Sequence, residues 1–350
     1  MNLTDSTLLA IGISGALSLS ACSETPGPAP ASLGGSAGAA GGSAVPGGGA
    51  GGSAAGGAAS QAGASGAPLA GSSGAGGVSG GGGVGSSGGG QGGQGGSSPL
   101  DPNAPQPSSA CGNADAPADG NQELQVGALS RSYVLRKPES YDASKPWPLL
   151  LALHPNGSTS SYWDGTSGER ALRPLLADEA ILVLPQSREN DMGDPDWRGD
   201  VPLDLAYFDA LLAELEGSLC IDLRRKYSMG FSGGGSFSGA LGCYRTDIAA
   251  IAIGGAVSYF EEADCVGKPA VWLTIGDQEA VQGRLDLRDY WRSYAGCAET
   301  GSIAEPATCT AYDCPDPARP VQFCSHPGDH VWPSFGTEAA WSFVSQFRRP

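Results

Sequence analysis

Apolar and polar residues follow a regular pattern only beyond about residue 130. Four continuous apolar runs have the length of strands that are buried on both faces of a parallel sheet, at 149–153, 181–184, 249–253 and 270–275. An alternating stretch at 132–136 fits a further strand, and residues 203–219 and 285–294 carry apolar side chains at helical spacing. Strands that alternate with helices predict an α/β domain with a doubly wound, mostly parallel sheet.

The first 110 residues differ in composition from the rest. Residues 1–21 are mostly apolar, whereas Gly, Ala, Ser and Pro dominate residues 23–110, and no Lys or Arg occurs before Arg131. A segment of the second kind cannot bury enough apolar surface to fold. We therefore predict a signal peptide at 1–21, a disordered linker at 22–110 with ends about 50 Å apart, and one folded domain at 111–350.

The apolar run from Leu8 to Leu19 is too short to span a bilayer as a helix. It ends in the sequence LSAC at 19–22, which resembles a bacterial lipobox, where cleavage precedes a cysteine that then receives lipid. This predicts a lipoprotein held at the outer membrane or cell surface through Cys22, retained there or released. Because the preceding residues lack Lys and Arg and include Asp5, a plain signal peptide with an incidental cysteine is the alternative.

The charge balance disfavours some partners. The chain has 36 acidic and 19 basic residues, a net charge of −17, so we expect binding neither to nucleic acid nor to an anionic membrane surface. The folded part, at about 240 residues, is long enough for a single α/β domain with a sizeable core.

The cysteines indicate an oxidising compartment. Apart from Cys22 there are eight, and an even number behind a secretory-type signal predicts up to four disulfides, whose connectivity stays open. With no C-x-x-C and three histidines, a zinc site is the weaker alternative. We expect no metal and no cofactor. The eight residues are Cys111, Cys220, Cys243, Cys265, Cys297, Cys309, Cys314 and Cys324.

One serine has the sequence context of a nucleophile. Ser232 is the centre of a G-x-S-x-G motif, GFSGG, between a predicted strand at 226–229 and a predicted helix at 236–243. Such a strand-to-helix turn exposes the hydroxyl at the edge of a sheet and aims the next N–H, that of Gly233, at the same point. The alternative is an ordinary glycine-rich turn. The motif also occurs, without this context, in the glycine-rich segment at Ser36, Ser79 and Ser87.

Three stretches of the chain resemble a known family of secreted esterases: YVLRKPESYDASKPWPLLLALHPNG, CIDLRRKYSMGFSGGG and VQFCSHPGDHVWP. They are similar to esterases grouped with polyhydroxybutyrate depolymerases and type-C-like feruloyl esterases, and the similarity runs from about Ser130 to Trp341. The resemblance implies the α/β-hydrolase fold and ester hydrolysis. It points to a family and not to one substrate.

A serine nucleophile needs a base, and the resemblance favours one histidine. His330 lies in GDHVWP, which matches the family's catalytic GH-x-WP with Asp329 in place of the glycine. His326 is the alternative base. His154 ends the strand at 149–153 and belongs to the loop expected to bind the oxyanion.

The third member of the triad should follow the strand at 270–275, where two acids are candidates. The family places its acid three residues after a glycine, which selects Glu279 after Gly276, whereas Asp277 has the shorter and commoner side chain for this role. Both stay open, and either preserves the order Ser, acid, His.

The oxyanion hole needs two N–H donors. Gly233 is one, and because Pro155 has no N–H, the other is Asn156 or Gly157. Three tryptophans are candidates for lining the substrate pocket, with packing beneath loops as the alternative. They are Trp163, Trp197 and Trp332.

Three functions are compatible with these residues. The leading hypothesis is an extracellular serine carboxylesterase that acts on a polymer-linked ester, such as a feruloyl or acetyl ester of plant polysaccharide. A polyhydroxyalkanoate depolymerase with the same triad is the second. The third is a non-catalytic surface-binding domain on a hydrolase scaffold, since a fold alone does not establish activity.

Overall fold

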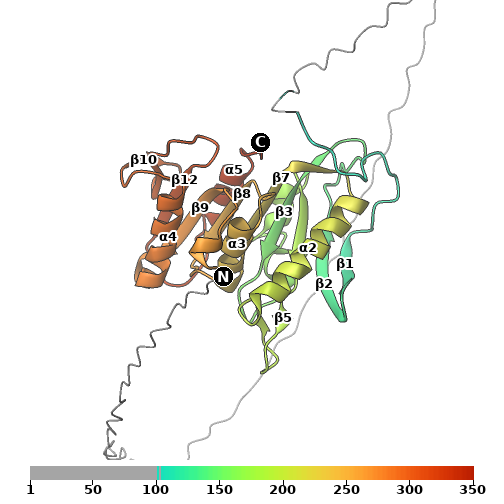
Figure 1. Ribbon diagram of the computed structural model, residues 1–350, viewed down its shortest axis with the longest axis horizontal. Coiled ribbons are helices and arrows are strands. Elements are labelled where there is room, and N and C mark those ends of the chain that lie inside the picture. The colour runs from blue at the N-terminus through green and yellow to red at the C-terminus, as the bar shows by residue number, and fades with distance from the viewer. Residues whose placement is uncertain (1–100, 102–103) are drawn as a thin grey trace, which may run out of the picture. The chain divides into compact units, whose positions relative to one another are not determined.

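The computed structural model describes Asp101 and residues 104–350. The predicted signal peptide, Cys22 and most of the predicted linker lie outside the described residues. A ten-stranded sheet forms the centre of the described part, in the order β1-β2-β4-β3-β7-β8-β9-β12-β11-β10 (Figure 1). Its strands are β1 (Gly120–Val126), β2 (Leu129–Arg136), β3 (Trp147–Leu153), β4 (Ile181–Pro185), β7 (Ile221–Phe231), β8 (Ala250–Gly254), β9 (Ala270–Gly276), β10 (Gly301–Ala304), β11 (Cys309–Tyr312) and β12 (Val321–His326).

The six strands from β4 to β12 pair in parallel, and the strands at both ends of the sheet pair antiparallel. Every residue of β3, β4, β8 and β9 is buried. This explains why these strands are continuous apolar runs in the sequence. The carboxyl ends of the parallel strands meet at one edge, where β7 ends at Phe231 and β9 at Gly276.

Helices cover both faces of the sheet (Figure 1). Side chains from α1 and α5 join the hydrophobic cluster on one face, and those from α2, α3 and α4 join the clusters on the other. The predicted doubly wound, mostly parallel α/β sheet is therefore confirmed. The helices are α1 (Leu172–Leu176), α2 (Val201–Ser218), α3 (Gly233–Tyr244), α4 (Gln282–Tyr294) and α5 (Gly336–Val344), with 3₁₀ turns η1 (Ser160–Trp163), η2 (Glu262–Asp264) and η3 (Asp277–Glu279).

The folded part begins before Cys111, the boundary predicted from composition. Pro107 forms a β-bridge with Asp222, and the N–H of Ser108 donates to the carbonyl of Ile221 at 2.9 Å. The eight cysteines form four disulfides, which is typical of proteins outside the cytosol. The pairs are Cys111–Cys220, Cys243–Cys265, Cys297–Cys314 and Cys309–Cys324.

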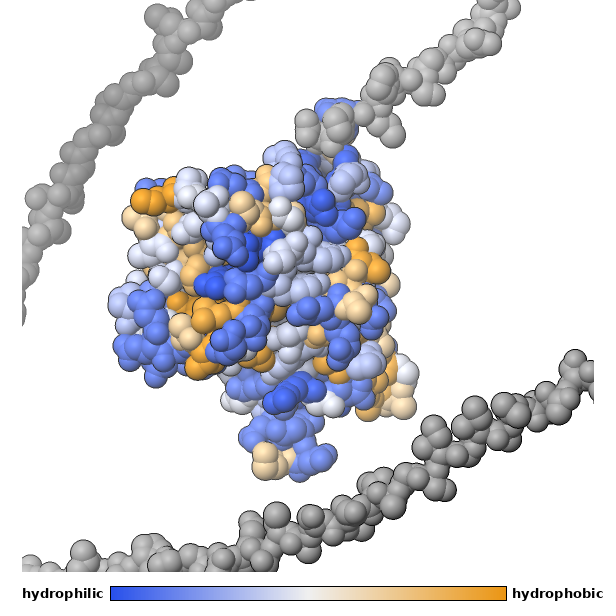
Figure 2. All heavy atoms as spheres, turned by 60° about the vertical axis from the view of Figure 1, so that its left-hand side comes forward, coloured by the Kyte–Doolittle hydropathy of each residue, from blue (hydrophilic) through white to orange (hydrophobic). Residues whose placement is uncertain are grey.

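A small hairpin, β5 (Arg188–Glu189) with β6 (Pro195–Asp196), leaves the main sheet between β4 and α2. Its tip projects at the lower end of the domain (Figure 1). The face of the domain seen in Figure 2 is largely hydrophilic and carries scattered hydrophobic patches. Within the described residues, no helix combines the length and the apolar character needed to cross a membrane.

Candidate active site

Ser232 lies on a strained turn between β7 and α3. Its φ of 56° and ψ of −124° make it the one non-glycine residue with positive φ in the described part of the chain. The backbone is fixed there because the N–H of Ser232 donates to the carbonyl of Gly254 at 2.8 Å. The turn leaves the side chain half-buried at the carboxyl edge of the sheet, where a substrate can reach its hydroxyl.

Two glycines of the motif are required by close backbone approach. A Cβ added at Gly230 would lie 2.3 Å from the carbonyl oxygen of Gly234, and one added at Gly234 would lie 2.3 Å from that of Leu153. Both distances are far below contact distance, so only glycine lets the strand and the helix meet here. The G-x-S-x-G spacing is therefore a packing requirement of this turn.

His330 bridges the serine and an acid. Its Nε2 lies 2.9 Å from Ser232 Oγ, and its Nδ1 forms a short contact with Glu279 Oε2. The ring of Phe231 stacks on the imidazole with centroids 4.7 Å apart. The side chain of His330 is 36% exposed, whereas that of Glu279 is 4% exposed. The structure thus joins a half-buried hydroxyl to a buried carboxylate through one imidazole.

The two candidate acids have different surroundings. Glu279 ends η3 and turns inward, and its Oε1 accepts from the N–H of Gly276 at 3.2 Å. Asp277 is exposed, and no hydrogen bond joins it to His330 in the described part of the chain. The geometry therefore brings Glu279 to the imidazole and leaves Asp277 at the surface.

Neither of the other histidines reaches Ser232. His326 is buried, and its Nδ1 accepts from the N–H of Gly328 at 3.2 Å. His154 is fully buried, and burial lowers its pKa to about 4. Its Nε2 accepts from the N–H of Ser187 at 3.1 Å. His154 is therefore a neutral residue that holds the loop after β3 in place.

The loop after β3 offers one N–H beside the turn between β7 and α3 that carries Ser232, which we call the elbow. The N–H of Gly157 donates to the carbonyl of Pro195 at 2.7 Å, so it is occupied. Those of Asn156 and Gly233 have no acceptor among the described residues, and Gly233 is the first residue of α3, where helical N–H groups lack partners. A Cβ at Gly233 would lie 2.0 Å from Asn156 Oδ1, so the two residues are in contact.

The β5–β6 hairpin fixes the side chain of Asn156. Asn156 Nδ2 donates to Asp196 Oδ1 at 2.7 Å, and Asn156 Oδ1 accepts from the N–H of Trp197 at 3.0 Å. Sequence patterns gave no sign of this hairpin, because its strands have two residues each.

Comparison with known proteins identifies esterases among the relatives of this chain. No family model matches the chain. Relatives include the probable feruloyl esterase C of Aspergillus oryzae, 29% identical over 256 residues that cover 67% of this chain and 90% of that protein. Feruloyl esterase C of Emericella nidulans is also 29% identical, covering 66% of this chain and 91% of that protein. The chain has the α/β-hydrolase fold and is similar to feruloyl esterases. It is a carboxylic ester hydrolase.

Solved structures similar to the esterase have lower sequence identity. A CE1 ferulic acid esterase from Anaeromyces mucronatus, solved in complex with ferulic acid, is 17% identical with a TM-score of 0.47, covering 67% of this chain and 92% of that one. The structure of YahD with malic acid is 16% identical with a TM-score of 0.42, covering 62% and 98%.

The three tryptophans predicted to line the substrate pocket lie beneath it instead. Trp163 and Trp197 are 0% exposed and Trp332 is 4% exposed. Each indole N–H is also used internally, by the carbonyls of Leu153 and His154 and by Thr337 Oγ1 respectively. Buried rings cannot offer a face to a substrate, so this prediction is corrected to core packing.

Exposed valines flank the triad of the esterase. Val331 follows His330 directly and is 51% exposed, and Val281, two residues after Glu279, is 53% exposed. Val257, at 36% exposed, lies against the start of α4 near Gly283. Val331 and Val281 thus provide exposed apolar surface close in the chain to His330 and Glu279.

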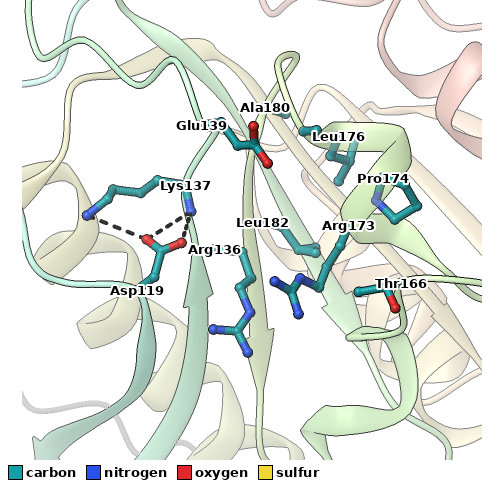
Figure 3. A pocket seen from close by; sticks show the side chains of 11 residues that line it. Asp119, Arg136, Lys137, Glu139, Thr166, Arg173, Pro174, Leu176, Ala180 and Leu182 are labelled. Carbon is teal, nitrogen blue, oxygen red and sulfur yellow. Dashed lines mark hydrogen bonds and ion pairs between the residues drawn. The ribbon is translucent and has the colours of Figure 1, made fainter. Parts of the chain in front are cut away.

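A separate cavity of about 280 Å³ lies between β2, β4 and α1 (Figure 3). The guanidinium groups of Arg136 and Arg173 turn toward the same region of it, and both pair with Asp164, at 2.6 and 3.8 Å. Lys137 pairs with Asp119 at 3.5 Å. No triad residue lines this cavity, and its cations already have partners, so it does not extend the ester site.

Proposed function

We propose that the esterase is an extracellular serine esterase that hydrolyses feruloyl or acetyl esters of plant polysaccharides through an acyl-enzyme on Ser232. The observation that carries this is the chain of contacts from Ser232 through His330 to Glu279 at a strained strand-to-helix turn. The relatives named feruloyl esterases support the substrate class.

The acylation step uses these residues in order. His330 Nε2 takes the proton of Ser232 as Oγ forms a bond to the ester carbonyl carbon, and Glu279 balances the imidazolium charge. The carbonyl oxygen becomes an oxyanion, which accepts from the N–H groups of Gly233 and Asn156. The bond to the alcohol oxygen then breaks as His330 returns the proton to it. The alcohol leaves, and the acyl group stays on Ser232.

Deacylation repeats the same proton movements with water. His330 takes a proton from water as its oxygen attacks the acyl carbon, the bond to Ser232 Oγ breaks, and the proton passes to that oxygen. The products are the carboxylic acid and free enzyme. The half-exposed site leaves room for water beside the imidazole.

An ester panel tests the substrate class. We expect the purified domain to hydrolyse methyl ferulate or acetylated xylan at least as well as p-nitrophenyl acetate, and to leave poly(3-hydroxybutyrate) film intact. Release of hydroxybutyrate without release of ferulate or acetate would assign the second function, that of a polyester depolymerase, to the same triad. Hydrolysis of none of these esters would contradict the proposal.

We also propose that Cys22 is lipidated after removal of residues 1–21. The LSAC sequence supports this, and several acyl chains on one residue give a stable anchor where one chain is marginal. Cells fed radiolabelled palmitate should incorporate label into the full chain and not into Cys22→Ser. Secretion of unlabelled full-length protein would favour the plain signal peptide.

A further inference from the structure

Arg284 contacts two members of the triad at once. It lies in the first turn of α4, and its side chain is 20% exposed. Its Nε lies 3.1 Å from Glu279 Oε2 and donates to the carbonyl of Gly255 at 3.1 Å. One terminal guanidinium nitrogen lies 3.3 Å from His330 Nδ1.

The ion pair with Arg284 compensates the buried charge of Glu279. Glu279 is 4% exposed, and a carboxylate removed from water must be compensated by charge and hydrogen bonds. Among the described residues, Arg284 is the one permanent cation within ion-pair distance of Glu279. It approaches from α4, whereas the N–H of Gly276 approaches from the end of β9. The carboxylate is thus held from two sides with one oxygen against the imidazole.

Glu279 and Arg284 favour different tautomers of His330. A carboxylate accepts, so Glu279 favours the tautomer with its proton on Nδ1, which leaves Nε2 free to take the proton of Ser232. A guanidinium only donates, so Arg284 alone favours a bare Nδ1 and a proton on Nε2. That second tautomer cannot act as the base.

The groups that face the imidazole come from several elements. Glu279 in η3 and Arg284 in α4 are the charged groups in contact with it, and Phe231 of β7 stacks on its ring. Asp277 and Asp329 are exposed and make no hydrogen bond to the ring within the described residues.

We propose that Arg284 is a positioning residue of the triad: it holds Glu279 against Nδ1 of His330 and places a permanent positive charge beside the imidazole ring. The inference rests on the proposed function. A cation beside the ring opposes its protonation, so neutralising Arg284 must move the acid limb of the pH profile upward. An arginine that only braces the loop through Gly255 would not have this effect.

The first experiment compares pH profiles of kcat/KM on p-nitrophenyl acetate. In Arg284→Gln we expect the midpoint of the acid limb to rise by about 1 pH unit, the size expected for a unit charge about 4 Å away in a solvent-screened site. Arg284→Lys retains the charge and should keep the midpoint of the wild type. The matched control is Arg288→Gln, one turn further along α4, where the arginine is 24% exposed and pairs with Asp289. An unchanged midpoint in Arg284→Gln would overturn the proposal.

The second experiment uses Glu279→Gln with and without Arg284→Gln. In Glu279→Gln, Arg284 is free to donate to Nδ1 and to hold His330 in the inactive tautomer. Removing Arg284 as well should therefore restore kcat about tenfold over Glu279→Gln alone, within the range of coupling between residues in contact. The double variant leaves no unpaired buried charge, so it keeps the proposal testable where Arg284→Gln alone fails to fold. A double variant no faster than Glu279→Gln would contradict the tautomer argument.

The activity of Ser232→Ala distinguishes failure of the proposed function from failure of the proposed role of Arg284. If Ser232→Ala keeps the wild-type rate, the proposed function fails. If Ser232→Ala is inactive while Arg284→Gln has the wild-type midpoint and the double variant shows no recovery, the role of Arg284 fails alone.

Discussion

The nucleophile and the acid of the triad lie at the same edge of the sheet, which we call the catalytic edge, but different interactions hold them there. At the elbow, Ser232 is fixed by backbone: a positive φ, a hydrogen bond to Gly254 and glycines at van der Waals limits. At the acid corner, between β9 and α4, Glu279 is fixed by charge and hydrogen bonds from Arg284, His330 and a backbone N–H. The nucleophile therefore depends on packing, and the acid depends on ionisation.

This difference separates two kinds of sensitivity. Packing tolerates changes of pH and salt but not an added methyl group, whereas an ion pair tolerates small changes of shape but not the loss of a charge. Variants on the two sides should therefore fail in different assays.

The largest effect is expected at Ser232, because the elbow positions its hydroxyl and Glu279 acts on it through His330. Ser232→Ala should lower kcat on p-nitrophenyl acetate by several powers of ten, about 10⁶ in the comparable serine-protease case, because no acyl-enzyme can form. The thermal unfolding midpoint should stay near that of the wild type. Activity within tenfold of the wild type would mean that neither side of the edge serves this serine.

Charge at the acid corner is tested by Glu279→Gln against Asp277→Asn. The first should lower kcat by about 10⁴, because the imidazole loses the partner that selects its tautomer. The second is the matched control, since Asp277 lies two residues earlier on the same turn and is exposed. Equal losses in both variants would remove the distinction between the two acids.

The loop after β3 is an intermediate case, with a backbone donor held by side-chain hydrogen bonds. Asn156→Ala removes the contacts with Asp196 and Trp197 but keeps the N–H. Loss of an oxyanion donor lowers kcat by about 10²–10³-fold. Because the N–H remains, we expect a smaller fall in kcat, with KM little changed. Asn190→Ala at the hairpin tip serves as the control, and an equal loss there would point to the hairpin as a whole.

Packing at the elbow is tested by Gly230→Ala. The added Cβ would lie 2.3 Å from a carbonyl oxygen of α3, so the free energy of unfolding should fall by about 3 kcal/mol at any pH. Gly217→Ala in α2 meets nothing within 4 Å, and there alanine should add about 0.5–1 kcal/mol. Urea titration of both variants measures the difference. A tolerated Gly230→Ala would show that the elbow relaxes.

The effect that is smallest per step of the variable, here the pH, concerns His154, a buried group whose pKa is lowered by burial from 6.5 to about 4. The contribution of neutral His154 to stability is complete above pH 6.5 and is lost as the pH falls toward 4. In this window the histidine binds a proton in the unfolded chain but stays neutral in the native state. The free energy of unfolding should drop by about 1 kcal/mol per pH unit in this window. His154→Asn should show a flatter dependence, and an equal slope in both proteins would assign the loss to other groups.

Sequence patterns predicted the centre of the fold because the signal there is local. Strands buried on both faces are continuous apolar runs, as at β3 and β9, and the elbow needs glycines at fixed spacing. The edge strands β10 and β11 gave no such signal, since they have four residues each and are mostly exposed or half-buried. A disulfide between Cys309 and Cys324 holds β11 to β12 in place of a hydrophobic face.

At the site, sequence could name candidates but not their orientation. Asp277 and Glu279 lie in one short turn, and only the inward rotation of η3 decides which carboxylate is buried. Tryptophans near the motifs were equally ambiguous, because the same ring suits a pocket and a core. Arg284 was missed, although it had one signal: a cation in the first turn of a helix opposes the helix dipole and therefore needs another partner.

Strand β7 joins two ends of the molecule that have different roles. The chain enters the domain beside Ile221, where Ser108 pairs with the first residue of the strand, and Ser232 follows its last. Eleven residues at about 3.3 Å each separate these points by about 35 Å. In the anchored protein that we propose, the point of attachment and the mouth of the active site therefore lie at opposite ends of one rigid strand. Attachment of the linker at Ser108 therefore leaves the edge of the sheet that carries Ser232 clear of the linker.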